Sequence, residues 1–125
     1  MKKIITISIL VLIAPIKNIC LSQNLPRIDK ETKSFYLYME NDDDTPLIFG
    51  YSLPNVQSEK IICFSSATSD IENNPNKCKL GSYYETSDIE IEYDSTIGDF
   101  IKLKLKSASN KDEYFYIKKS RVIFE

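Results

Sequence analysis

The segment from residue 88 to residue 106 constrains the fold more than any other part of the chain. It contains two runs of alternating apolar and polar residues around a polar turn. This alternation is typical of strands with one buried face and one solvent-facing face. The polar positions are acidic in the first run and lysines in the second. They are Asp88, Glu90, Glu92, Lys102, Lys104 and Lys106. The two runs therefore predict an antiparallel hairpin in which acids face lysines.

The turn of this hairpin is predicted at residues 94–99, with Tyr93 opposite Ile101. In that register Ile91 faces Leu103 on the apolar side, and each acid faces a lysine on the other side. A slip of one residue would bury the lysines, so the sequence strongly specifies which face is inside.

Similar short runs, separated by turn residues, predict an all-β fold for the rest of the chain. Leu105 is expected to face Phe115 of the next strand, and Leu103 to face Ile117. Gly50 is expected at a bulge or a close approach of two backbones. The predicted strands outside the hairpin cover residues 34–40, 47–53, 60–65, 113–119 and 122–124. We therefore predict a small antiparallel β-barrel or sandwich.

Residues 1–22 have the pattern of a secretory signal peptide. Two lysines follow Met1, and the apolar run from Ile4 to Ile16 is too short to span a bilayer. Cleavage after Ser22 would export the protein to the periplasm or the medium, with no integral membrane span left. Lipidation at Cys20 is the alternative.

Removal of this leader leaves 103 of 125 residues, which is the size of one small domain. The leader carries three lysines and no acid, so the formal net charge falls from −2 to −5. This charge disfavours nucleic acid and anionic membranes as partners. Residues 100–125 are nevertheless rich in basic side chains. The lysines of the hairpin explain part of this excess, and a separate basic docking patch is the other explanation.

Residues 23–33 are polar and lack periodicity, which predicts a flexible arm before a single β domain at residues 34–125. Cys63 and Cys78 are the cysteines left after export. An even pair in an oxidising compartment favours a disulfide between them. Metal binding is the rival interpretation, but a chain without histidine lacks an ordinary zinc ligand set.

The composition also argues against catalysis. Without histidine, a nucleophilic serine, cysteine or threonine lacks its usual base. Three glycines are too few for a phosphate-binding loop. We therefore expect no enzyme, no catalytic residues, no cofactor and no metal. Asp42, Asp43 and Asp44 form an acidic turn, but the spacing of a calcium loop is missing, so a solvated acidic surface is expected there.

Aromatic residues are the one suggestive excess, with eight tyrosines and six phenylalanines. Four of the tyrosines, Tyr36, Tyr38, Tyr114 and Tyr116, occupy strand positions opposite the expected core residues. Rigid tyrosine rings provide contact area at low entropic cost and favour recognition of proteins or sugars. Outward tyrosines also simply favour β-structure, which is the alternative explanation.

The last third of the chain resembles bacterial Src-homology-3-like domains. Phe100 stands at the usual aromatic position, Tyr116-Ile117 at an aromatic–aliphatic pair, and Lys119-Ser120-Arg121 at a helical turn before the closing strand. The resemblance implies a small barrel with a meander at its C-terminal end. It also implies binding of a protein or cell-wall ligand.

These observations lead to two functional hypotheses. The first is a non-catalytic exported binding module of the bacterial cell envelope, which holds a protein or peptidoglycan ligand through outward tyrosines and a surface loop. The second is a periplasmic inhibitor or immunity protein that blocks an enzyme such as a cell-wall hydrolase. In that case an acidic surface, at residues 42–44 or in the loop 66–77, would plug a basic cleft.

Overall fold

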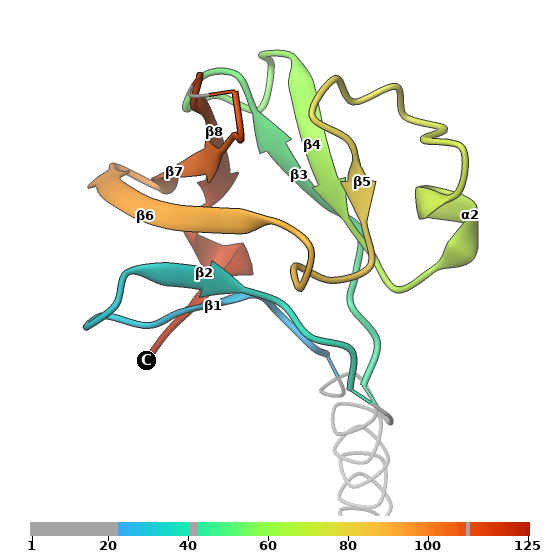
Figure 1. Cartoon of the computed structure of the whole chain (residues 1–125), viewed down its shortest axis with the longest axis horizontal. Coiled ribbons are helices and arrows are strands. Elements are labelled where there is room, and N and C mark those ends of the chain that lie inside the picture. Colours follow the sequence, from blue (N-terminus) through green and yellow to red (C-terminus); the bar gives the residue numbers. More distant parts are fainter. Residues whose placement is uncertain (1–22, 41–42, 110) are drawn as a thin grey trace, which may run out of the picture.

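The computed structural model describes residues 23–40, 43–109 and 111–125, and in these residues the chain is all-β (Figure 1). Helical structure in the described part consists of α2 (Thr68–Ile71) and the 3-10 helix η1 (Lys119–Arg121). The strands are β1 (Arg27–Ile28), β2 (Ser34–Tyr36), β3 (Ile48–Tyr51), β4 (Lys60–Phe64), β5 (Ser82–Tyr83), β6 (Glu90–Ile97), β7 (Phe100–Lys106), β8 (Glu113–Lys118) and β9 (Ile123–Phe124). The expected all-β class is confirmed. The predicted signal peptide lies outside the described residues.

All these strands belong to one hydrogen-bonded sheet with the order β5-β4-β3-β8-β7-β6-β2-β1-β9. Its pairs are antiparallel except for β4 with β5 and β1 with β9, which are parallel. The sheet curls around its core, so strands that are distant in this order meet inside (Figure 1). Phe35 of β2 and Phe64 of β4 show this, because their ring centroids are 5.5 Å apart.

Alternate residues of the strands fill this core, as period-2 patterning requires. The fully covered side chains include Ile62, Ile101, Leu103, Phe115 and Ile117, each with 0% of its surface exposed. A second, smaller apolar cluster lies under the α2 segment, outside the main core, and contains Cys63, Ile71 and Cys78. The fold thus has one main core and one satellite cluster.

The central hairpin forms on the predicted strands, but the predicted register is wrong by two residues. Tyr93 pairs with Leu103 rather than with Ile101. The chain turns at Gly98, whose φ of 58° is left-handed, so the loop is far tighter than the predicted turn at residues 94–99. A register shift between Tyr93 and Ser95 accommodates the extra residue. Because the error is an even number of residues, the predicted inward and outward faces are correct.

The same two-residue error applies to the next pair of strands. Leu103 rather than Leu105 faces Phe115, and Ile101 rather than Leu103 faces Ile117. The bulge expected at Gly50 is confirmed, because the register of β3 against β4 shifts between Gly50 and Tyr51. The close neighbours of Gly50 are side chains rather than a second backbone. A Cβ atom at this position would lie 2.6 Å from Cδ2 of Phe115 and closer still to Cγ2 of Ile62.

The structure differs from the expected flexible arm at residues 23–33. Strand β1 lies within this segment and pairs with both β2 and β9. Ile28 is only 1% exposed, and the Asn24 side-chain amide donates a hydrogen bond to the Tyr38 carbonyl oxygen. Pairing and burial therefore fix a segment whose polar composition indicated disorder.

Candidate functional site

A cleft opens on the surface where β3 and β8 separate. Strand β3 is paired with β4 from Ile48 to Tyr51, but with β8 only at the contact between Tyr51 and Tyr116. Continued pairing would have placed Phe49 opposite Lys118. Instead the two strands diverge from this point, and the space between them is the β3–β8 cleft.

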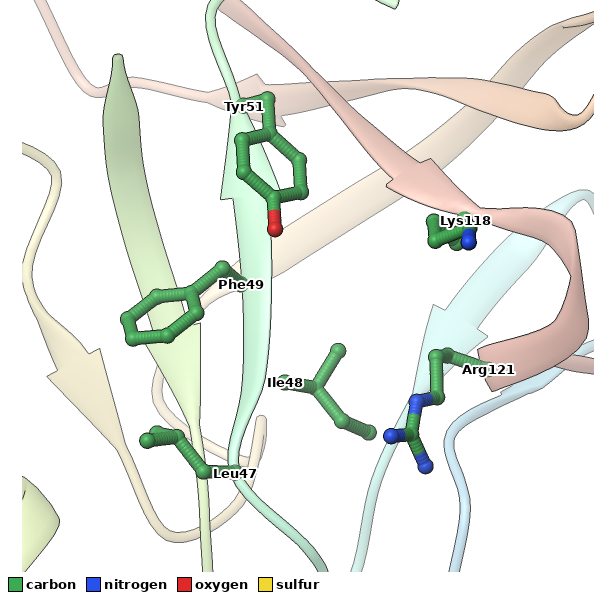
Figure 2. A pocket seen from close by; sticks show the side chains of 6 residues that line it. All are labelled: Leu47, Ile48, Phe49, Tyr51, Lys118 and Arg121. Carbon is green, nitrogen blue, oxygen red and sulfur yellow. The ribbon is translucent and has the colours of Figure 1, made fainter. Parts of the chain in front are cut away.

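The β3–β8 cleft has one apolar wall and one basic wall, and its volume is about 140 Å³. Figure 2 shows Ile48, Phe49 and Tyr51 along β3, with Lys118 and Arg121 across from them at the end of β8 and in η1. Leu47 completes the lining. Ile48 is buried and belongs to the main core, whereas the other three apolar or aromatic residues are half-buried. Ile48 therefore continues the main core into the cleft, whereas Leu47 and Phe49 also pack against the satellite cluster.

Tyr51 is held in place at the closed end of the cleft. Its ring meets that of Phe100 edge-on, with centroids 6.3 Å apart and an interplanar angle of 86°. Such perpendicular contacts between aromatic rings are favourable beyond the area that they bury. Figure 2 shows the Tyr51 hydroxyl directed into the cleft. A ring fixed in this way offers a preformed surface for a ligand.

The basic wall carries charges that the fold does not neutralise. The ion pairs in the described residues involve only Arg27, Lys104 and Lys106 as cations. Lys118 and Arg121 are exposed and form none of these pairs. The face of Phe49 is also close to a positive charge, because the Lys60 ammonium lies 4.5 Å from its ring centroid. The cleft is thus a local concentration of positive charge.

A shallower groove adjoins the cleft on the far side of Lys118. It is lined by Asp99, Lys118, Lys119 and Ser120, with a volume of about 400 Å³. The backbone N–H of Lys119 donates a hydrogen bond of 2.7 Å to the Asp99 carbonyl oxygen, which ties η1 to the tip of the central hairpin. Lys118 therefore borders both hollows.

The four predicted ligand-binding tyrosines lie in two separate pairs. Tyr36 and Tyr38 have ring centroids 5.4 Å apart and line a different groove of about 140 Å³. Strands β7 and β6 separate β8, which carries Tyr114 and Tyr116, from β2. At about 4.8 Å per strand spacing, the path along the sheet between the two pairs is roughly 14 Å. The four residues therefore do not form one patch.

One tyrosine of each pair also interacts with a charged side chain. The Tyr36 hydroxyl donates a hydrogen bond to the Glu125 carboxylate, which raises the pKa of Tyr36. Tyr38 is 54% exposed. On β8, the Lys102 ammonium lies 4.5 Å from the ring centroid of Tyr114. Of the four, Tyr116 is the one whose strand position adjoins the β3–β8 cleft.

The predicted acidic surface is described only in part. Asp42 lies outside the described residues. Asp43 is half-buried and Asp44 is exposed, and the Asp44 carbonyl oxygen accepts a hydrogen bond of 2.9 Å from the Asn24 N–H. The turn is thus anchored through its backbone.

The predicted disulfide is wrong for this structure. Cys63 and Cys78 are both free thiols, and both are buried in the satellite cluster. Burial raises the pKa of Cys63 to about 12, and the adjacent Cys78 thiol adds to this effect. Burial likewise raises the pKa of Cys78. The neutral thiols serve as apolar packing in place of the expected covalent link.

No pattern in the sequence predicts the β3–β8 cleft. Phe49 and Tyr51 are expected only in a strand, and Lys118 and Arg121 only at a strand end and in a helical turn. The basic excess of residues 100–125 was the signal that pointed here. This basic excess has two explanations in the sequence, the lysines of the hairpin and a separate docking patch. The sequence does not show that β3 lies beside β8, so it does not decide between them.

Comparison with protein-family models, curated proteins and solved structures finds no match to this chain. In the described residues, no helix is both long enough and apolar enough to cross a membrane. The same part of the chain contains no group of three or more acidic, cysteine or histidine side chains arranged to hold a metal ion. The proposal below therefore rests on the geometry of the site.

Proposed function

We propose that this protein is a non-catalytic exported binding module of the bacterial cell envelope, which holds a protein or peptidoglycan ligand. The observation that carries this proposal is the β3–β8 cleft, where a preformed aromatic and apolar wall faces basic side chains. Binding sites combine apolar area with a few polar groups that orient the ligand in this way. The export of the protein is inferred from the pattern of residues 1–22.

The local structure next to the cleft supports the same proposal. The 3-10 helix at Lys119–Arg121 and the short closing strand β9 occur where the resemblance to bacterial Src-homology-3-like domains places them. Because η1 supplies Arg121 to the cleft, the element that carries the resemblance is also part of the site.

The inhibitor hypothesis receives less support. It depends on an acidic surface that enters a basic cleft of an enzyme. The described members of that surface are Asp43 and Asp44 in one version and Asp70 and Glu72 of the loop 66–77 in the other. The more sharply formed hollow is basic and belongs to this protein. The geometry therefore favours a protein that receives a ligand over one that plugs a partner.

Substitution of one tyrosine in each of two grooves, Tyr51 and Tyr38, tests the proposal. The immobilised protein is incubated with an envelope extract of exported proteins, and separately sedimented with purified peptidoglycan. We expect Tyr51→Ala to abolish one of these interactions, because the variant loses the ring that forms the closed end of the cleft. Tyr38→Ala is the matched control, since it removes the same ring from the other groove.

Each outcome has a defined meaning. Loss of binding in Tyr38→Ala but not in Tyr51→Ala would place the site in the groove next to β2 and contradict the cleft. Binding of neither material by the wild-type protein would overturn the proposed function. Circular dichroism of all three variants shows whether a loss of binding in Tyr51→Ala reflects an unfolded protein. Tyr51→Phe, which keeps the ring, shows whether binding also needs the hydroxyl.

A further inference from the structure

The shape and charge of the β3–β8 cleft also indicate what kind of ligand enters it. We propose that the cleft binds an acidic segment of a partner protein, which places one apolar side chain against the β3 wall and carboxylates against Lys118 and Arg121. This inference rests on the proposed function, and of its two ligand classes it selects a protein over peptidoglycan.

The volume of the cleft argues for a single side chain of a longer chain. Sites that enclose a whole small molecule commonly have volumes of about 300–1,000 Å³. The cleft has only about 140 Å³, and the adjoining groove is shallow and open. A ligand that inserts one side chain and continues along the surface past Lys118 uses both hollows. An extended peptide has this form.

The chemistry of the apolar wall indicates the inserted side chain. Ile48 presents aliphatic surface toward the basic residues, and Tyr51 adds a ring held by its contact with Phe100. Leu47 and Phe49, which also pack against the satellite cluster, complete the apolar lining. Burial of an aliphatic or aromatic side chain against such a wall removes apolar area from water on both partners, which favours binding. A sugar ring, with hydroxyls around its edge, would leave more polar groups without partners on this wall.

The charges of the basic wall indicate the flanking residues of the ligand. Lys118 and Arg121 are exposed and have no ion pair in the described part of the chain, and Lys119 follows in the same helical turn. Lys60 adds a positive charge on the β3 side, above Phe49. The planar guanidinium of Arg121 matches the geometry of a carboxylate. Two cations line the cleft, Lys118 and Arg121, and Lys119 lies beside the adjoining groove, where Asp99 is the acid of the lining. This excess of positive charge favours carboxylates next to the inserted side chain.

A nucleic acid would be an alternative anionic partner, but the charge of the whole protein argues against it. The formal net charge is −2 for the full chain. Binding of nucleic acid depends on attraction of many phosphates over a wide basic surface. Here the positive charge is local, and acidic residues dominate the sequence from residue 23 to residue 99. A short acidic peptide needs only the local charge.

Two probe peptides test this inference on the purified protein. One is the acetylated and amidated peptide Glu-Glu-Phe-Glu-Glu, and the other replaces each glutamate by glutamine. Binding of the fluorescently labelled peptides is measured by anisotropy at low salt and at about 150 mM salt, where the Debye length is about 8 Å. We expect the acidic peptide to bind at least about tenfold more tightly than the neutral one, and the difference to shrink as salt rises.

Charge-removing variants locate the binding. The double variant Lys118→Gln/Arg121→Gln is expected to weaken binding of the acidic peptide about tenfold. Lys111→Gln is the control, because Lys111 is exposed and lies beyond the opposite end of β8. All these positions are on the surface, and a thermal melt of each variant verifies that the fold is retained.

The possible results separate this inference from the proposed function. If the wild-type protein binds the two peptides with equal affinity and Tyr51→Ala binds neither, the ligand need not be acidic. That result would overturn this inference but leave the cleft as a binding site. Equal weakening by Lys111→Gln would also overturn it, because net charge alone would then explain the effect. Binding of neither peptide, or tighter binding of a single-stranded oligonucleotide of equal charge, would likewise contradict an acidic protein segment. The proposed function would fall only if the capture experiments also failed.

Discussion

Gly50 shows how one missing side chain allows β3 to pack against the core. The position faces inward, where Ile62 of the neighbouring strand β4 and Phe115 of β8 leave no room for a Cβ atom. Gly50→Ala is expected to destabilise the protein by about 1–3 kcal/mol, the usual cost of overpacking a core. Chemical denaturation monitored by circular dichroism measures this loss.

Gly98→Asn is the control for this prediction. Gly98 also has a special backbone conformation, with a φ of 58°, but a Cβ atom there meets no other atom within 4 Å. Asparagine tolerates a left-handed conformation better than most residues, so the effect is expected to be small. If both substitutions cost the same, the role of Gly50 would be conformational and the packing argument would be wrong.

The central hairpin shows which pairs of charges form across its strands. The sequence predicted three pairs, but the structure concentrates the interaction on one acid. The carboxylate of Glu92 lies 3.5 Å from the Lys104 ammonium and 3.7 Å from the Lys106 ammonium. Asp88, one of the predicted partners, precedes the start of β6 at Glu90. One carboxylate therefore bridges two lysines, and a second acid lies outside the ladder.

This arrangement predicts different effects for two neighbouring acids. Glu92→Gln is expected to lower the melting temperature slightly, and the difference from the wild-type protein should shrink with added salt. Glu90→Gln changes the net charge equally, on the same strand and the same face, but Glu90 makes no ion pair in the described residues. A salt-dependent effect of equal size in both variants would contradict the bridge. Calorimetry at low and high salt provides the measurement.

At this scale, local patterning predicted the hairpin well, and the turn was the source of error. Alternation correctly assigned Ile91 and Leu103 to the inside, because side-chain direction depends only on position along a strand. The register required the location of the turn. The polar run at residues 94–99 suggested a long loop, but Ser95, Thr96 and Ile97 continue β6 to a tight turn at Gly98. Polarity alone does not distinguish a loop from the solvent-facing end of a strand.

Residues from opposite ends of the described chain are joined at β1, β2 and β9. The Arg27 guanidinium lies 3.0 Å from the Glu125 carboxylate, which also accepts a hydrogen bond from Tyr36. These contacts cross the ladder in which β1 pairs with both other strands. They explain why residues 23–33 are not a free arm, since an ordered partner for this segment comes from the other end of the chain.

The same contacts predict a specific dependence of stability on pH. The hydrogen bond from Tyr36 and the charge of Arg27 lower the pKa of Glu125. A carboxyl whose pKa is lowered by folding stabilises the protein above its unfolded pKa of about 4.3, and this contribution is lost as the pH falls through the folded value. The stability difference between wild type and Glu125→Gln is therefore expected to be largest near neutral pH and to disappear in acid.

Denaturation of the wild type and the variant across this pH range measures the effect. Glu31→Gln is the control, because Glu31 is exposed and makes no ion pair in the described residues. A difference between wild type and Glu125→Gln that stays constant down to the lowest pH would contradict this assignment.

The candidate site required information that no local pattern contains. The basic excess near the C-terminus could be counted in the sequence, and the helical turn at Lys119–Arg121 was predicted. The cleft, however, exists because β3 lies beside β8 and then separates from it. That adjacency joins segments about 65 residues apart in the chain, and patterning does not specify which distant strands become neighbours. The predicted tyrosines lie in two separate pairs for the same reason.

The strands at the two edges of the sheet are short, and this affects whether copies of the protein can pair edge to edge. The long ladders of β6, β7 and β8 are all interior, whereas β5 and β9 at the two borders have only two residues each. A border this short offers few free backbone groups on which another chain could template a strand. Crowded copies should therefore resist stacking into fibrils, even though the chain is rich in residues that favour β-structure.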